Sequence, residues 1–321
     1  MPLLEVKNLK VRYHIRNNVG VSGSCVVRAV DGVSFDIQAG ETLGLVGESG
    51  CGKSTLGRAL AGLIKPASGT IHFDGVDLTA AVGRRTRAQC KSIQMIFQDP
   101  YGSLNPRMTV ENIVGEGLDI HRLTPVKENR HSRIANLLHR VGLGGEHMSR
   151  YPHEFSGGQR QRIGIARALA VEPRLLICDE PVSALDVSVQ AQIINLLQDL
   201  NKQLGLACLF IAHDLAVVEH LCHRVLVMYL GRIMEMAEAK TLVAQPLHPY
   251  TQALISAIPV LDPETQRKRI VLQGDVPSPL NPPAGCPFHP RCTMAVERCR
   301  MELPTLRQLA PNHAVACHLA G

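Results

Sequence analysis

The first part of the chain alternates apolar and polar residues in short runs, which is typical of β-strands. Residues 4–6 and 9–13 form one such run, and residues 29–37 form another. Residues 17–24 are rich in Gly, Ser and Asn and predict a hairpin loop between the two runs. We therefore expect the chain to open with an antiparallel sheet.

Later apolar runs lack this alternation, which is typical of strands buried on both faces of a parallel sheet. These runs cover residues 41–46, 92–98, 174–179 and 207–212, and shorter strands are expected at 71–75 and within 223–236. Helical spacing of apolar residues predicts helices over 56–63, 109–118, 129–141, 163–170 and 187–204. Strands alternating with helices predict an α/β fold, and residues of about 100–168 predict a mostly helical subdomain.

One strand end carries a complete phosphate-binding pattern. Residues 47–54 fit G-x-x-x-x-G-K-[ST] at every fixed position, between a predicted strand and a predicted helix. Glycines allow backbone N–H groups to converge on an anion, and a helix start adds partial positive charge. In such a loop Lys53 reaches the β- and γ-phosphates of ATP, and Ser54 holds Mg²⁺. The predicted loop contacts are Gly47, Glu48, Ser49, Gly50, Cys51, Gly52, Lys53, Ser54 and Thr55.

Other strand ends carry polar residues suited to the same nucleotide. Asp179 suits Mg²⁺, which prefers oxygen ligands, and Glu180 suits a base or water-orienting role. Gln98 and His213 each follow an apolar run, where ligands bind in open α/β sheets. Tyr13, upstream of the loop, either stacks on an adenine ring or packs as an ordinary strand tyrosine.

A second glycine-containing turn lies inside the helical region. Ser156 is a candidate helix N-cap, and Gly157 and Gly158 expose backbone N–H groups at a helix start. This turn predicts a second anion site. One nucleotide cannot easily use two such sites of one subunit, so the pattern indicates sharing between subunits.

Composition narrows the class of protein. The chain has 321 residues, 45% of them hydrophobic, which suits a globular protein with two domains. No run of 18 apolar residues occurs, and the mixed charges of residues 1–10 do not predict a secretory signal. The net charge of +6 permits nucleic-acid contact but does not indicate it, and the basic residues 84–87 predict a solvated helix face. Prolines accumulate beyond residue 240, where we place a domain boundary.

Ten cysteines in a chain without an export signal argue against disulfides. Cys286, Cys292, Cys299 and Cys317 are crowded near the C-terminus with the spacing C-x5-C-x6-C-x17-C. Four thiolates suit Zn²⁺ or an iron–sulfur cluster, and the spacing alone leaves both open, together with unliganded thiols.

Together these motifs resemble the ATP-binding subunits of ABC transporters. The loop at 47–54, Gln98, the turn at 156–159, Asp179 with Glu180, residues 183–186 and His213 follow the family's order of Walker A, Q-loop, signature, Walker B, D-loop and H-loop. Phe155 stands where the commonest signature has leucine. The resemblance implies a P-loop NTPase: a RecA-like parallel sheet with an antiparallel β subdomain and a helical subdomain over residues 1–240, and a small loop-rich appendage over 241–321.

The resemblance also implies roles. Two such subunits stack head to tail, so Ser156, Gly157, Gly158, Gln159 and Asp186 would act on the partner's ATP. Glu180 would polarise the attacking water, and His213 would contact the γ-phosphate. Ser54 and Asp179 would support Mg²⁺, and Gln98 would orient water or the metal. A second, related ATPase subunit is the expected partner, although a homodimer stays open.

Segments 98–108, 248–251 and 286–292 are similar to the dipeptide/oligopeptide/nickel importer branch. This similarity implies a 4Fe–4S cluster at the four cysteines, two membrane permease subunits, an extracytoplasmic solute-binding protein and a peripheral place at the cytoplasmic face of the membrane. Di- or oligopeptides are the expected cargo, with nickel, glutathione or another small solute as alternatives. A soluble ABC ATPase acting on nucleic acid or ribosomes is disfavoured, because the chain has one ATPase module and no long coiled-coil insertion.

Overall fold

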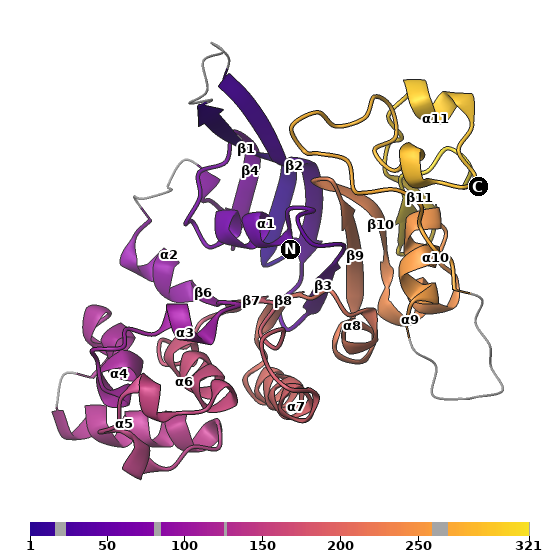
Figure 1. Ribbon diagram of the computed structural model, residues 1–321. Helices are drawn as coiled ribbons and strands as arrows, with labels where there is room; N and C mark the ends of the chain where they lie inside the picture. The colour runs from indigo at the N-terminus through magenta and orange to yellow at the C-terminus, as the bar shows by residue number, and fades with distance from the viewer. Residues whose placement is uncertain (17–23, 80–84, 125–126, 259–268, 321) are drawn as a thin grey trace. The chain divides into compact units, whose positions relative to one another are not determined.

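The computed structural model describes residues 1–16, 24–79, 85–124, 127–258 and 269–320 (Figure 1). The chain divides into two compact units. The first unit contains Met1–Gln38, Thr42–Val82 and Ala212–Gly321, and the second contains Ala39–Glu41 and Gly83–Ile211. The predicted hairpin loop lies outside the described residues, apart from Ser24.

An antiparallel sheet opens the first unit, as the alternating pattern predicts. Its order is β2-β1-β4-β5, with β1 at Leu4–Arg16, β2 at Ser24–Ile37, β4 at Ser68–Phe73 and β5 at Val76–Asp77. Val6 pairs with Phe35 on one side and with Ile71 on the other. Leu4, Val6, Leu9 and Val11 are fully buried or nearly so, so the apolar face of β1 forms core. β2 starts earlier than predicted, because neighbouring valines at 26–27 break the alternation on which the prediction rests.

A second set of strands in the first unit runs in the order β11-β12-β10-β9-β3. β3, at Thr42–Val46, lies parallel to β9, at Arg224–Tyr229, whereas the other neighbours are antiparallel. β10 covers Arg232–Glu238, β11 Arg307–Ala310 and β12 His313–Val315. β11 and β12 lie in a segment where the sequence predicts only loops. They are four and three residues long, too short for periodicity to mark them.

The helices of the first unit are short. They are α1 at Lys53–Leu60, α8 at Leu215–Leu221, α9 at Ala239–Ala244, α10 at Pro249–Ser256 and α11 at Glu297–Met301, with a 3₁₀ turn, η4, at His289–Arg291. α1 is predicted at 56–63 but begins at Lys53, directly after the glycine loop. Its first residues are polar and carry no apolar period, so the pattern misplaces its start.

The second unit contains three parallel strands in the order β8-β7-β6. β6 covers Ile93–Ile96, β7 Leu175–Asp179 and β8 Ala207–Ile211, and α7 at Val187–Leu204 connects β7 to β8. Every residue of β7 and β8 is buried. Continuous apolar runs therefore mark strands of a parallel sheet here, as predicted.

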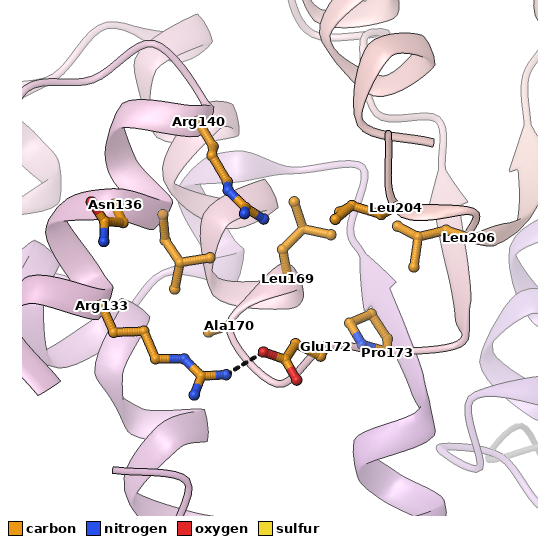
Figure 2. Close-up of a pocket in the computed structure, with 10 residues that line it drawn as sticks. Arg133, Asn136, Arg140, Leu169, Ala170, Glu172, Pro173, Leu204 and Leu206 are labelled. Atoms are coloured by element: carbon orange, nitrogen blue, oxygen red, sulfur yellow. Dashed lines mark hydrogen bonds and ion pairs between the residues drawn. The ribbon is translucent and has the colours of Figure 1, made fainter. Parts of the chain in front are cut away.

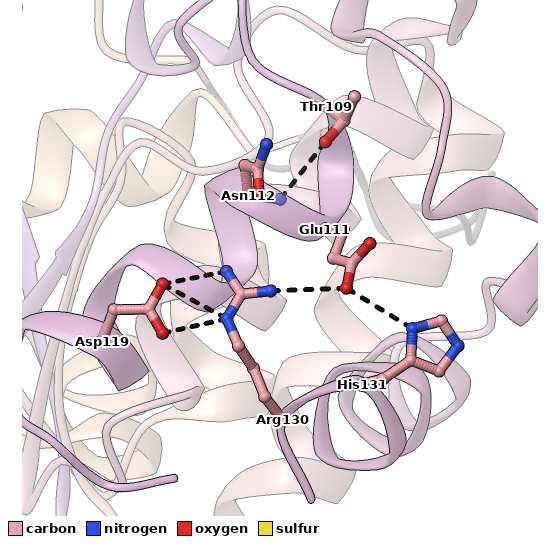
Figure 3. A network of polar contacts seen from close by, with 6 residues as sticks. All are labelled: Thr109, Glu111, Asn112, Asp119, Arg130 and His131. Carbon is pink, nitrogen blue, oxygen red and sulfur yellow. Dashed lines mark hydrogen bonds and ion pairs between the residues drawn. The ribbon is translucent and has the colours of Figure 1, made fainter. Parts of the chain in front are cut away.

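Helices α3, α4, α5 and α6 gather in one part of the second unit (Figure 1). Their bounds are Pro100–Ser103, Val110–Ile120, Lys127–Arg140 and Gly157–Leu169; α2 at Arg87–Ser92 and 3₁₀ turns at Gly145–His147 and Pro152–Glu154 complete the unit. Arg130 on α5 joins α4 by hydrogen bonds to Asp119 at 2.9 Å and an ion pair with Glu111 at 3.3 Å (Figure 3). Thr109 caps α4 by accepting from the Asn112 N–H. The helical character of residues 100–168 is thus as expected.

The helix predicted at 163–170 begins six residues earlier, at Gly157. Two glycines and four polar residues in its first turns hide the apolar spacing. Among the described residues, no helix is both long enough and apolar enough to cross a bilayer. The domain boundary near residue 240 stays a prediction.

Candidate nucleotide-binding site

The phosphate loop joins β3 to α1 in the first unit, as the motif requires. Gly47, Gly50 and Gly52 have positive φ angles of 152°, 78° and 105°. A Cβ on Gly47 would lie 2.2 Å from the Met228 carbonyl oxygen, and one on Gly52 would lie 2.0 Å from the Ala29 oxygen. Neighbouring backbone on both sides therefore excludes side chains, so only glycine fits these two positions.

Lys53 begins α1, and its side chain folds back over the loop. Its ammonium group donates hydrogen bonds to the carbonyl oxygens of Gly47 at 2.7 Å and Glu48 at 3.1 Å. Lys53 is only 4% exposed, so its charge is held against the loop itself. Burial raises the pKa of the neighbouring Cys51 thiol, which keeps this loop residue uncharged. The loop therefore presents one fixed positive charge and a helix start, which is the arrangement that binds phosphate.

Tyr13 and His213 lie at the same end of the first unit as the loop. The Tyr13 hydroxyl is 3.5 Å from the Thr55 hydroxyl, and the side chain is 39% exposed. This partial exposure leaves part of the side chain accessible to a stacking partner. Ala212, which precedes His213, donates its N–H to Leu45 of β3 at 3.1 Å. His213 is exposed, and this hydrogen bond of its neighbour Ala212 places it beside the end of β3, the strand that leads into the phosphate loop.

Tyr250 also contacts the phosphate loop. The sequence did not predict a role for this residue. Its hydroxyl accepts the Glu48 backbone N–H at 2.8 Å. Burial raises the pKa of Tyr250 far above its ordinary value, so it remains a neutral phenol. His248 caps α10 by accepting the Tyr250 N–H at 3.0 Å, which places the ring. The His-Pro-Tyr-Thr segment was visible in the sequence, but its contact partner lies about 200 residues away.

The second unit brings together two residues that are 82 positions apart. Gln98 follows β6, and its side-chain amide donates to the Glu180 carboxylate at 2.9 Å. Glu180 follows β7, has φ of 45° and donates its N–H to the Ile211 carbonyl at 3.0 Å. Asp179, the last residue of β7, is fully buried. The prediction that polar residues at neighbouring strand ends converge holds for Gln98 and Glu180.

The second glycine turn forms a regular, capped helix start. The Ser156 hydroxyl accepts the Gln159 N–H at 3.4 Å, and the Gln159 side chain accepts the Ser156 N–H at 3.0 Å. This capping box confirms Ser156 as the N-cap of α6. A Cβ on Gly157 would meet the Leu185 methyl at 3.2 Å, and one on Gly158 would meet a Val189 methyl at 2.4 Å. The turn therefore lies against the start of α7, where Asp186 is the N-cap.

The four C-terminal cysteines are mostly buried, with Cys292 half-buried. Burial raises the pKa of Cys286 to about 11, and the three other thiols lie near enough to raise it further. Within the described part of the chain, however, no three His, Cys, Asp or Glu side chains are arranged to hold a metal ion. As placed, the thiols do not form a ligand set, so the predicted metal site lacks support.

A hollow of about 310 Å³ in the second unit lies apart from the motif residues (Figure 2). Arg133 and Arg140 of α5, Leu169 of α6 and Leu204 of α7 line it. The Arg133 guanidinium forms an ion pair with the Glu172 carboxylate there, at 2.6 Å. None of the residues predicted to bind ATP lines this hollow.

A glycine loop shaped by neighbouring backbone, an inward lysine and a Gln–Glu pair at parallel strand ends define a P-loop ATPase of the ABC class. Solved structures agree. The chain resembles the ATP-binding cassette MJ0796, described as dimeric and bound to ADP and Pi, with TM-score 0.64, 27% identity and coverage of 74% of this chain and 98% of that one. It also resembles cbiO1 from Clostridium perfringens, part of the transporter complex cbiONQ, with TM-score 0.63 and 30% identity over 76% and 91% of the two chains.

Sequence comparison gives the family. The "ABC transporter" family model matches residues 30–183, and the model "Oligopeptide/dipeptide transporter, C-terminal region" matches residues 234–299. The chain is 54% identical to the probable peptide ABC transporter ATP-binding protein y4tS of Sinorhizobium fredii, over 99% of this chain and 90% of that protein. It is 52% identical to the oligopeptide transport ATP-binding protein AppF of Bacillus subtilis, over 99% and 97%. The chain belongs to the family of ABC transporter ATP-binding subunits.

Proposed function

We propose that the chain is the ATP-hydrolysing subunit that energises a membrane importer of di- and oligopeptides. The phosphate loop carries this proposal, because backbone contacts exclude side chains at Gly47 and Gly52 and Lys53 is held inward. The peptide cargo is supported by the named relatives and by the C-terminal family model. Nickel, glutathione or another small solute is the alternative cargo.

In this proposal Lys53 binds the β- and γ-phosphates, Ser54 and Asp179 hold Mg²⁺, and Tyr13 lies under the adenine. Glu180 orients and polarises the attacking water, while Gln98, which donates to the Glu180 carboxylate, keeps that carboxylate in place. His213 contacts the γ-phosphate. These side chains bind and orient the nucleotide, and the Mg²⁺ ion supplies charge neutralisation on the phosphates when it is bound.

We further propose that two ATPase subunits assemble head to tail. Ser156, Gly157, Gly158 and Gln159 would then complete the partner's site, and Asp186 would lie at the seam. A capped helix start whose glycines expose backbone N–H groups suits the partner's phosphates. The dimeric state of MJ0796 supports this arrangement. A related second ATPase chain, two permeases and a solute-binding protein complete the complex at the cytoplasmic face of the membrane.

Glu180→Gln tests the central role. In the assembled importer we expect ATP to bind normally while hydrolysis falls by about 10²–10⁴-fold, because the amide cannot act as a base. Glu172→Gln is the matched control, since Glu172 is an exposed carboxylate of the same unit that pairs with Arg133. Normal hydrolysis by Glu180→Gln would exclude the proposed role.

Cargo is tested separately. The complex should import a labelled di- or oligopeptide in an ATP-dependent manner when reconstituted in vesicles. Nickel uptake without peptide uptake would assign the alternative cargo while leaving the ATPase proposal intact.

The proposal includes a 4Fe–4S cluster at the four C-terminal cysteines. The mutual approach of four thiols favours it, whereas their placement does not form a ligand set. No step of ATP hydrolysis depends on it. Iron and sulfide analysis of complex prepared without oxygen decides the matter, and a colourless, iron-free preparation removes the cluster from the proposal.

A further inference from the structure

Glu48, the second residue of the phosphate loop, is held from three directions. Its carboxylate accepts two hydrogen bonds from the Arg291 guanidinium, at 2.5 and 3.1 Å. Its backbone N–H donates to the Tyr250 hydroxyl at 2.8 Å, and its carbonyl accepts from Lys53 at 3.1 Å. The loop that is to receive phosphates is thus fixed from outside by two residues of the C-terminal segment.

The pair between Arg291 and Glu48 is largely screened from water. The Arg291 side chain is 8% exposed and the Glu48 side chain 26%. Hydrogen bonds to Glu48 raise the pKa of Arg291, and burial opposes this effect. A bidentate Arg–carboxylate pair fixes both position and orientation. Removing one partner from such a site leaves an uncompensated buried charge.

Arg291 is itself positioned by the cysteine-containing segment. It ends the 3₁₀ turn η4 between Cys286 and Cys292, with its N–H bonded to the Phe288 carbonyl at 3.0 Å. The Phe288 ring packs on Tyr229 and Tyr250 at centroid distances of 5.4 and 5.3 Å. Residues 286–292 therefore form a unit with the aromatic side chains behind the phosphate loop.

The charge of Glu48 makes this contact relevant to binding. A carboxylate within the loop opposes the approach of a triphosphate, and a guanidinium at 2.5 Å neutralises it. We propose that Arg291 is a positioning residue for nucleotide binding, which holds the phosphate loop in its receiving shape and neutralises Glu48. The C-terminal segment then takes part in ATP binding through Arg291. This inference rests on the proposed ATPase function.

The test measures binding of a fluorescent ATP analogue with Mg²⁺ to the full-length chain. Arg291→Gln should weaken binding by about tenfold or more, because Glu48 then keeps an unpaired charge. Arg291→Lys keeps the positive charge but loses the bidentate geometry, so its loss should be smaller. The double variant Glu48→Gln with Arg291→Gln should regain most of the lost affinity, since the two neutral amides leave no unpaired charge.

Urea unfolding of the same variants separates this role from a purely structural one, in which affinity would fall only as far as folding stability does. Arg298→Gln is the matched control, because Arg298 forms an exposed ion pair with Glu302 in the same segment. This variant should bind nucleotide as the native chain does. Native-like affinity of Arg291→Gln, or a double variant as weak as Arg291→Gln, would overturn the inference. If the native chain itself fails to bind the analogue, the proposed ATPase function fails instead, so the two failures are distinguishable.

Discussion

The chain contains two glycine turns at helix starts, and they use glycine for different reasons. In the phosphate loop, Gly52 has φ of 105°, and a Cβ there would lie 2.0 Å from the Ala29 carbonyl oxygen. At the start of α6, Gly157 has an ordinary helical backbone, and a Cβ there would meet only the Leu185 methyl at 3.2 Å. Gly52 is required by the fold of its own unit, whereas Gly157 is not.

The two turns therefore differ in what requires glycine: contacts within the chain in one and, in the proposed assembly, a ligand bound by another subunit in the other. The phosphate loop is surrounded by its own chain, with Tyr250 and Arg291 supporting Glu48. The α6 turn is capped by Ser156 and needs no unusual backbone. In the proposed assembly the bare backbone at Gly157 serves a ligand from another subunit, so its effect should appear only in the complex.

The largest effect is expected from Gly52→Ala. The positive φ costs about 1–3 kcal/mol for alanine, and the collision with a carbonyl adds to this strain. We expect ATP binding by the full-length chain to fall by about a hundredfold, measured by nucleotide titration. Gly164→Ala in α6 is the control, because its Cβ would meet nothing within 4 Å. Native affinity of Gly52→Ala would contradict the local requirement.

Gly157→Ala should act differently. The chain should fold and bind ATP as before, because only a side-chain methyl must shift. ATP turnover of the assembled complex should fall by about a hundredfold, as expected for a misplacement of roughly 1 Å at a reacting group. Weaker ATP binding by the single chain would show that the turn acts within its own subunit.

The support behind the phosphate loop should respond to acid. Burial lowers the pKa of His248 from 6.5 to about 3, so the folded chain holds it neutral while the unfolded chain protonates it. This contribution to stability is complete above pH 6.5 and is lost as the pH falls toward 3, by about 1.4 kcal/mol per pH unit. Between pH 7 and 5 we expect a loss of about 2 kcal/mol from His248.

Urea unfolding at both pH values measures this loss. His248→Asn keeps a helix-capping side chain without a titrating ring, so it should show a smaller decrease between the two pH values. Equal decreases in the variant and the native chain would show that His248 does not titrate on unfolding.

The smallest effect is expected from replacing either of two similar helix N-caps. Ser156 and Thr86 each form a capping box in the second unit. Replacement of either by alanine should cost about 1 kcal/mol of stability in thermal or urea unfolding. Only Ser156→Ala should also reduce turnover of the complex. Equal activity of the two variants would reduce Ser156 to a structural cap.

Strand-end reasoning selected two residues that the structure brings together. Gln98 and Glu180 were each found as polar residues after an apolar run, and the structure joins them at 2.9 Å. Parallel strands bring their carboxyl ends to one edge of the sheet, so the sequence pattern is enough to predict that these two residues lie close together. The same reasoning misplaced the starts of α1 and α6, because glycines and polar residues at a helix start carry no apolar period.

The sequence by itself determined the P-loop class, the site motifs and the longer strands, since each depends on residues close together in the chain. Only the tertiary structure showed that Arg291 pairs with Glu48 and that Tyr250 supports the same residue. These partners are 243 and 202 positions apart. No local spacing records such a contact, because it depends on how β9, β10 and the C-terminal segment pack behind the loop.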